Sequence, residues 1–158
     1  MNKYRPAAES GRDFDVGLQR TRAEKTGRKL AEWIAKHPDD RTAGGVRVLK
    51  DRRSVLVYWK GTAPAGLRLL AARQPVSVTF QQAAYSRAEL TAAVAAVMKN
   101  PDVSAAGSES DYSGISVVLS AKAPANAFAR IKATSTVPTT LRWIGDPVPL
   151  RRAAGDDD

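Results

Sequence analysis

Few residues in this chain could carry out chemistry. His37 is the only histidine and there is no cysteine, so thiolate nucleophiles, disulfides and Cys-based metal sites are excluded. A catalytic triad would require a carboxylate and a nucleophile that converge on His37, but the chain has no GxSxG nucleophile turn. At the end of a predicted helix, the imidazole can instead complement the last carbonyl groups. The sequence therefore predicts a protein that is not an enzyme.

Paired carboxylates are the remaining candidates for acid–base chemistry, and all of them fall in predicted loops or helix ends. We interpret them as solvated caps and turns rather than as a general acid and base. No glycine-rich phosphate loop is present, because Gly44-Gly45 and Gly61 lack a following GKS or GKT element. Neither a cofactor nor a metal is expected. The carboxylate pairs are Asp13/Asp15, Asp39/Asp40 and Glu109/Asp111.

A basic patch is expected near the N-terminus. The chain has a net charge of +9, and residues 1–60 hold 15 of the 25 Lys/Arg but only 8 of the 16 Asp/Glu. Glu24 and Glu32 are interspersed with these cations at helix spacing, and stacking aromatics are missing, so a solvated helix face is favoured over a nucleic-acid or anion site. The patch consists of Arg20, Arg22, Lys25, Arg28 and Lys29.

No membrane contact is predicted, since no apolar run approaches the ~20 residues that cross a bilayer. No apolar h-region follows Met1, so a signal peptide is not evident in this numbering. A cytoplasmic location and the removal of a leader are both consistent with this start.

The first half of the chain has clear helix and strand patterns. Leu30, Trp33 and Ile34 make an apolar stripe that predicts a helix over 28–36, and the helical pattern extends back through 13–27. Alternating apolar residues over 44–61 predict a β-hairpin. We then expect a helix over 63–73 with Thr62 as its N-cap, followed by a strand over 76–80.

The second half continues with alternating helices and strands. Ser86 and Glu89 form a predicted capping box for a helix whose apolar face is Leu90, Val94, Val97 and Met98. Strands are expected over 103–106, 115–119 and 137–144, with a helix beginning at Pro124. No internal repeat is evident.

These elements indicate an α+β fold with helices packed on one face of a mixed, mostly antiparallel sheet, preceded by an N-terminal basic helix. We expect a basic, partly helical extension over 1–43, an α+β domain over 44–150, and a flexible acidic tail over 151–158.

A series of motifs over residues 44–150 resembles the pro-region of actinobacterial chymotrypsin-like serine proteases of the streptogrisin and α-lytic type. It begins with a strand ending in YWKG, Tyr58 to Gly61, followed by Pro64 at a helix start. Val76 to Phe80, Ala84-Tyr85-Ser86, Asp111 to Ile115 and Val137-Pro138 follow in the same order. The protease domain itself is not in this sequence.

This resemblance implies a protein-binding module that acts as folding chaperone, inhibitor or both towards a chymotrypsin-like serine protease, or a protein with that fold, and it implies secretion. It implies sheet-edge pairing around Leu141 and Trp143, and a cleft-occupying tail that includes Leu150, Arg151 and Arg152.

Tyr58 and Trp59 point to opposite strand faces, so at least one could be an exposed partner contact, although core packing of both is the simpler interpretation. The alternatives are a structural adaptor in a larger assembly and an anion or nucleic-acid binder.

Overall fold

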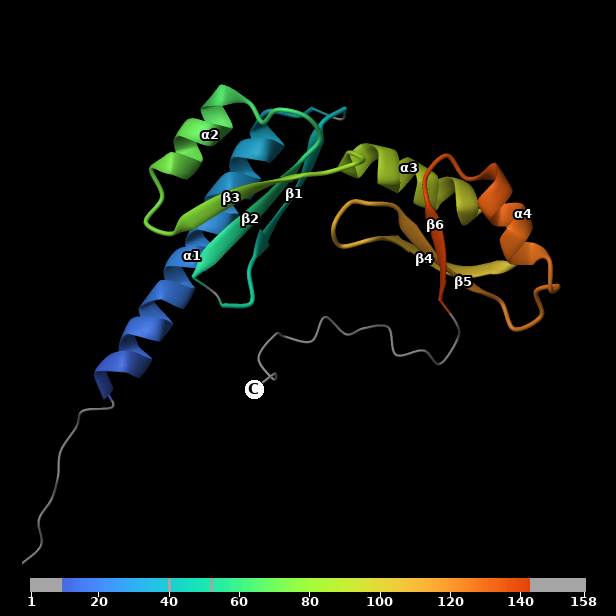
Figure 1. The fold of residues 1–158 in the computed structure, drawn as a ribbon, viewed down its shortest axis with the longest axis horizontal. Coiled ribbons are helices and arrows are strands. Elements are labelled where there is room, and N and C mark those ends of the chain that lie inside the picture. The colour runs from blue at the N-terminus through green and yellow to red at the C-terminus, as the bar shows by residue number, and fades with distance from the viewer. Residues whose placement is uncertain (1–9, 40, 52, 143–158) are drawn as a thin grey trace, which may run out of the picture.

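The structure, a computed structural model, describes residues 10–39, 41–51 and 53–142, and side chains from residue 21 onward. These residues form two units that lie side by side (Figure 1). The first unit contains α1 (Ser10–Lys36), β1 (Ala43–Val48), β2 (Ser54–Trp59), α2 (Ala65–Ala72) and β3 (Ser77–Gln82). The second unit contains α3 (Arg87–Val97), β4 (Val103–Ser108), β5 (Ile115–Leu119), α4 (Ala127–Thr134) and β6 (Thr139–Arg142).

The α+β class expected from the sequence is confirmed, and the strands are divided between two three-stranded mixed sheets. In each sheet the first two strands form an antiparallel hairpin, and the third strand returns parallel to the second after a crossover helix. The orders are β1-β2-β3 and β4-β5-β6. The middle strand of each sheet is therefore the only one with neighbours on both sides.

The two units repeat one structural plan, which corrects the expectation that the chain has no internal repeat. The register shifts between Ala43 and Gly45 in β1, and it shifts at the equivalent place between Val103 and Ala105 in β4. The repeat is not visible in the sequence because β2 and β5 are so different. When they are aligned by these registers, they are identical at one position, where Val57 corresponds to Val117. Both units bury the side chains at two of these aligned positions, Val55 and Ile115, and Val57 and Val117.

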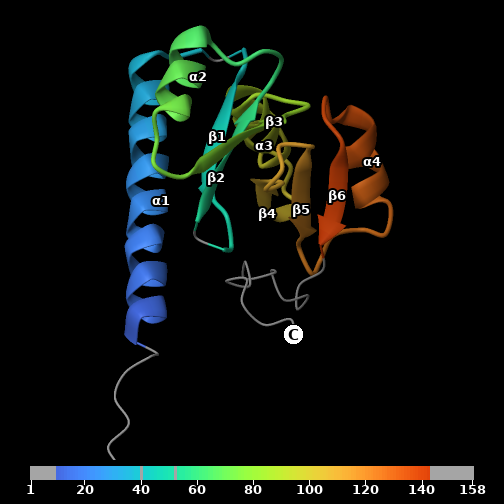
Figure 2. The same cartoon turned by 60° about the vertical axis from the view of Figure 1, so that its left-hand side comes forward.

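The first core lies between the sheet β1-β2-β3 and the helices α1 and α2. Its buried side chains include Leu30 from α1, Val57 and Trp59 from β2, and Leu67 from α2. The long helix α1 runs along this sheet and extends well beyond it (Figure 2). The predicted N-terminal extension therefore packs into the first unit, because Ala23 and Leu30 are both 0% exposed.

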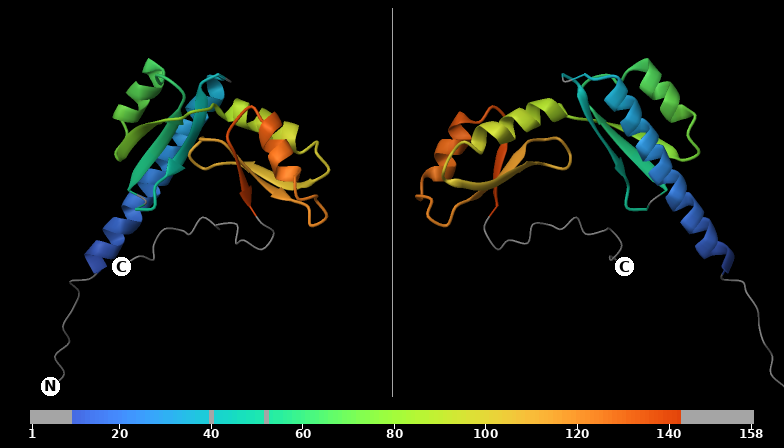
Figure 3. Two further views of the ribbon diagram at one scale, coloured as in Figure 1. Left: turned by 45° about the vertical axis from the view of Figure 1, so that its right-hand side comes forward. Right: turned by 180° about the vertical axis from the view of Figure 1, so that it is seen from behind.

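The second core lies between the sheet β4-β5-β6 and the helices α3 and α4, and Figure 3 shows these helices on one side of the sheet. Leu90 and Val97 are buried there as predicted, together with Ala93. The predicted apolar face of α3 is wrong at Met98, which is 44% exposed, because this residue forms the C-cap beyond the last helical turn.

Two predicted helix starts have different outcomes. The capping box of α3 is confirmed: the Ser86 side chain accepts from the Glu89 backbone N–H, and the Glu89 side chain accepts from the Ser86 backbone N–H. Thr62 is not the N-cap of α2, since the helix begins after Pro64 without a side-chain cap. Pro64 is itself the residue before the first turn, and its ring has no oxygen with which to cap the helix.

None of the described helices is long and apolar enough to cross a membrane.

The packing of α1 leads to a stability prediction. Leu30→Ala should destabilise the protein by about 2–5 kcal/mol, because it removes a fully buried side chain and leaves a cavity. The matched control Leu69→Ala removes a leucine that is 59% exposed and should change stability by less than about 0.5 kcal/mol. Urea unfolding followed by circular dichroism measures both. Equal effects of the two variants would show that α1 does not contribute to the core.

Candidate functional site

The outer edge of β6 is the candidate site, since the resemblance to protease pro-regions implies sheet-edge pairing around Leu141. Among the described residues, β6 pairs only with β5. The Ile115 N–H donates to the Pro138 carbonyl at 2.9 Å, so the main chain of Pro138, and of every second residue after it, points towards β5. The N–H and C=O groups of Thr139 and Leu141 consequently point away from the sheet.

The side chain of Leu141 has a different role from its main chain. It packs against the second core and is partly buried, on the same face of the sheet as the helices. The side chain therefore anchors β6, while the peptide groups of the same residue are available for pairing. The sequence-based prediction named Leu141 as a pairing residue without separating its side chain from its peptide groups.

Glu109 neutralises the charge on β6 from the opposite side of the sheet. Its Oε1 accepts a hydrogen bond from Thr140 Oγ1 at 2.9 Å, and its Oε2 lies 3.3 Å from Arg142 Nη2. The ion pair is mostly shielded, with side-chain exposures of 24% for Glu109 and 31% for Arg142. These two partners correct the prediction that Glu109 is a solvated carboxylate, and only the sheet topology reveals them.

Gly114 allows β6 to approach the start of β5. A Cβ atom at this position would collide with the Pro138 carbonyl oxygen, which is the acceptor for the Ile115 N–H. Thr139 is buried at the start of β6, and its hydroxyl lies 2.9 Å from Ser135 Oγ and 3.1 Å from the Val137 carbonyl. The position of the edge is thus determined by backbone contact and by a buried hydroxyl.

Tyr58 and Trp59, the predicted partner contacts, are both buried, at 6% and 2% exposure. Trp59 lies in the first core, where its Nε1 has no hydrogen-bond partner. Tyr58 lies on the opposite face of β2, where Tyr112 of the second unit covers it with a ring-centroid distance of 5.2 Å. The simpler interpretation, that both rings pack inside, is therefore confirmed, and the alternative of one exposed ring is wrong because the second unit covers Tyr58.

Tyr112 is a contact residue that the sequence analysis did not identify. Its backbone has φ of 60°, a left-handed conformation that is uncommon for a bulky residue. Its hydroxyl occupies the position where a side chain on Gly45 would begin, and its carbonyl accepts from the Tyr85 N–H at 3.3 Å. The turn before β5 is thereby held against both the first sheet and the segment joining the two units.

A second contact between the units is the ion pair of Lys60 and Glu89, in which Nζ and Oε1 are 2.6 Å apart. Glu89 Oε2 also accepts from the Ser86 backbone N–H at 2.7 Å. The hydrogen bond from Lys60 and then that from the Ser86 backbone hold the pKa of Glu89 below its usual value. One carboxylate thus caps α3 and ties it to the residue that follows β2.

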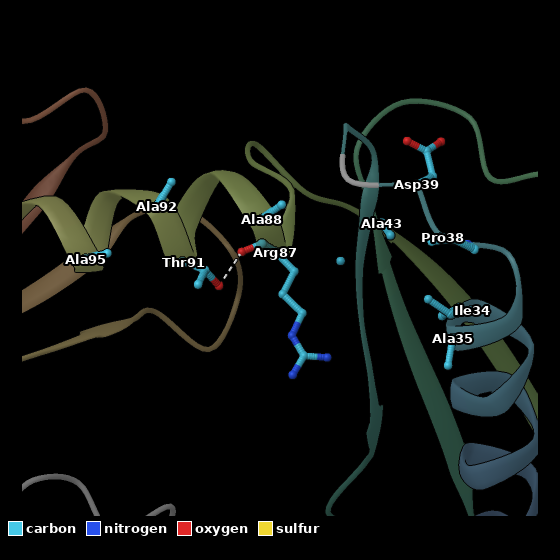
Figure 4. A pocket seen from close by; sticks show the side chains of 11 residues that line it. Ile34, Ala35, Pro38, Asp39, Ala43, Arg87, Ala88, Thr91, Ala92 and Ala95 are labelled. Atoms are coloured by element: carbon cyan, nitrogen blue, oxygen red, sulfur yellow. Dashed lines mark hydrogen bonds between the residues drawn. The ribbon is translucent and has the colours of Figure 1, made fainter.

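An apolar groove of about 510 Å³ lies between α3 and the end of α1. Figure 4 shows Arg87 and Thr91 on α3 opposite Ile34 and Ala35 on α1. The Asp39 carboxylate at its rim accepts from the Thr42 hydroxyl and from the Arg41 backbone N–H, and these hydrogen bonds lower its pKa. Apart from Asp39, Arg87 and Thr91 its lining is apolar, and we interpret the groove as the gap between the two units.

Asp111 and His37 both have local structural partners. Asp111 accepts from the Ser113 hydroxyl, and this bond lowers its pKa. His37 stacks on Trp33 with ring centroids 4.0 Å apart, and its Nδ1 lies 2.8 Å from the Trp33 carbonyl oxygen. The prediction that His37 complements the last carbonyls of a helix is confirmed.

The basic patch lies on the solvent side of α1. Arg22, Lys25, Arg28 and Lys29 are exposed, and so are Glu24 and Glu32 among them. The side chain of Arg20 falls outside the described part of α1, and Trp143, Leu150, Arg151 and Arg152 lie outside the described residues. The roles expected for the terminal segment therefore stay predictions.

No family model matches the chain, and no significant match was found among curated proteins or among solved structures. The resemblance to protease pro-regions therefore rests on the motifs in residues 44–150 alone.

The close approach at Gly114 yields a test of how β6 is positioned. Gly114→Ala should destabilise the second unit by about 1–3 kcal/mol, because the added methyl group overlaps the Pro138 carbonyl. Gly107→Ala in β4 is the matched control: no heavy atom lies within 4 Å of an added Cβ, and the change should be within about 0.5 kcal/mol. Thermal unfolding measures both variants, and equal values would contradict this account of β6.

The Lys60–Glu89 pair predicts a pH effect. The pKa of Glu89 is lowered on folding, so its contribution to stability is present above the usual value of 4.5 and is lost as the pH falls through the folded-state pKa. Because both side chains are more than a third exposed, this contribution should not exceed about 1 kcal/mol.

Glu89→Gln keeps an oxygen that can cap α3 and removes only the charge. It should be less stable than the unmodified protein at neutral pH and equally stable well below pH 4.5. Urea unfolding across this range measures the difference. A difference that persists unchanged at low pH would contradict the assignment.

Proposed function

We propose that this chain is a non-catalytic protein-binding module that pairs the outer edge of β6 with an extended segment of a chymotrypsin-like serine protease, and so assists its folding, inhibits it, or both. The observation that carries the proposal is the edge itself, where the peptide groups of Thr139 and Leu141 point away from β5. Strand addition to such an edge provides affinity through main-chain hydrogen bonds.

Three further features support β6 as the pairing strand. Glu109 neutralises Arg142, so an incoming strand meets little net charge at this edge. Thr139 and Leu141 have buried or partly buried side chains, so the edge is ordered before a partner arrives and loses less conformational entropy on binding. The resemblance over residues 44–150 supplies the class of partner.

A chaperone role follows from the folding problem of the partner. Chymotrypsin-like proteases are rich in long-range β pairing, which forms slowly because distant segments must meet before they gain contacts. A preformed sheet that adds a partner strand stabilises such pairing early. If the segment that includes Leu150, Arg151 and Arg152 then occupies the active-site cleft, the same molecule also inhibits.

The test of this function is a refolding assay. A denatured actinobacterial chymotrypsin-like protease is diluted into buffer with and without the protein, and recovered activity is measured. We expect recovery to increase at equimolar protein and activity to fall at excess. The absence of both effects across several such proteases would contradict the proposal.

Two substitutions at one position test whether the edge peptide group is used. Leu141→Ala and Leu141→Pro both remove the packing of the side chain, but only proline removes the N–H that points outward. In the refolding or inhibition assay, Leu141→Pro should bind at least about tenfold more weakly than Leu141→Ala, which corresponds to a lost hydrogen-bond donor of about 1.4 kcal/mol. Circular dichroism confirms that both variants are folded. Equal binding would exclude this peptide group.

A role as structural adaptor predicts a different partner. Affinity purification from the host with mass spectrometry separates the two functions, because a protease partner supports the first and a complex without a protease supports the second. An anion or nucleic-acid site is less favoured, since Glu24 and Glu32 are exposed among the cations of α1.

A further inference from the structure

The outer edge of β3 is an unprotected strand edge among the described residues. Two of the other outer strands carry a feature that limits pairing: β1 has Arg47 and a register irregularity, and β4 has an irregularity. The remaining outer strand, β6, lies in the other sheet and is the edge of the proposed function. β3 has six residues, Ser-Val-Thr-Phe-Gln-Gln, in regular register with β2. Natural proteins protect edges with charges, prolines, bulges or short strands, and β3 has none of these.

The main chain of β3 offers a regular set of free groups at this edge. The Ala83 N–H donates to the Trp59 carbonyl at 2.9 Å, which orients Ala83 and every second residue before it towards β2. The N–H and C=O groups of Val78, Phe80 and Gln82 therefore point outward. Their spacing is the one that an antiparallel partner strand requires.

The side-chain pattern of residues 77–81 in β3 is symmetric about Thr79. Val78 and Phe80, one on each side, pack against the first core and remain partly exposed. Ser77 and Gln81, the next pair, are polar and exposed on the other face. No charged residue stands between Arg73 and Arg87. A second copy of this strand that runs antiparallel to the first therefore presents matching side chains to it.

We propose that the edge of β3 binds β3 of a second copy of this chain, antiparallel and centred on Thr79. A two-fold axis through the Thr79 pair keeps the helix-covered faces of both sheets on the same side. Val78 of one copy then exchanges main-chain hydrogen bonds with Phe80 of the other, and Ser77 lies opposite Gln81. The result is one six-stranded sheet in the order β1-β2-β3-β3-β2-β1.

The symmetry argues for a second copy over an unrelated partner. Within residues 77–81 each apolar side chain meets an apolar one and each polar side chain meets a polar one, with Thr79 opposite Thr79, a cross-strand pair that is itself stabilising. The match ends at Gln82, which lies opposite Val76. The inference does not depend on the proposed function, because β6 belongs to the other sheet and its edge stays free.

The absence of cysteine allows a register-specific cross-linking test. Thr79 lies in a non-hydrogen-bonded pair with its copy, where Cα atoms are ~4.5 Å apart, a distance that a disulfide can span. Thr79→Cys should form a disulfide-linked dimer under mild oxidation. Ser77→Cys and Gln81→Cys should not cross-link separately, but should cross-link when the two variants are mixed.

The oligomeric state of the protein without added cysteine is measured by sedimentation equilibrium at up to about 1 mM, since such a small interface should be weak. We expect a concentration-dependent dimer. Thr79→Lys should weaken it at least about fivefold, because two like charges face each other. Ser104→Lys adds the same charge to exposed β4 and should leave it unchanged.

A monomer at every concentration, with no Thr79→Cys cross-link above the level of Ser77→Cys, would overturn the proposal. A dimer that cross-links at none of these positions, or that tolerates Thr79→Lys, would overturn the β3 edge in favour of another interface. Gel filtration and circular dichroism of each variant confirm that it is folded.

Discussion

The relation between the two units depends on Glu89. Its two oxygens bind groups from different parts of the chain, Lys60 after β2 and the backbone of Ser86 before α3. A helix cap is normally a local feature, but here the capping carboxylate also fixes the direction in which the second unit leaves the first. Tyr112 adds an aromatic contact to Tyr58 at the same junction. Two small contacts thereby orient two separate cores.

Each unit covers one face of a three-stranded sheet with helices. Three strands leave two edges and a second face, and the junction covers only the part of that face around Tyr58. β3 and β6 have free edges because each is the third strand of a three-stranded sheet and lies beside the middle strand. The arrangement of each unit therefore leaves edges that can bind a further strand, and the side chains on each edge determine which edge does so.

The order of helices and strands follows from the sequence because its signals are local. The capping box at Ser86 and Glu89 and the alternating apolar residues of β2 each act within a few positions. The division into two sheets, the repeat and the contact of Tyr58 with Tyr112 were not predicted, because each depends on contacts between distant residues. For Glu109, no signal in a single sequence indicates that it binds Thr140 and Arg142 across a sheet.

The repeated plan has a consequence for the time course of synthesis. All the pairings of the first sheet are complete by Gln82, and no strand of one unit enters the sheet of the other. Domains generally fold as units, and N-terminal ones fold first as the chain is made. The first unit can therefore fold on the ribosome before β4 is translated. The nascent second unit then meets a preformed surface, with Lys60 and Tyr58 already in place to orient it.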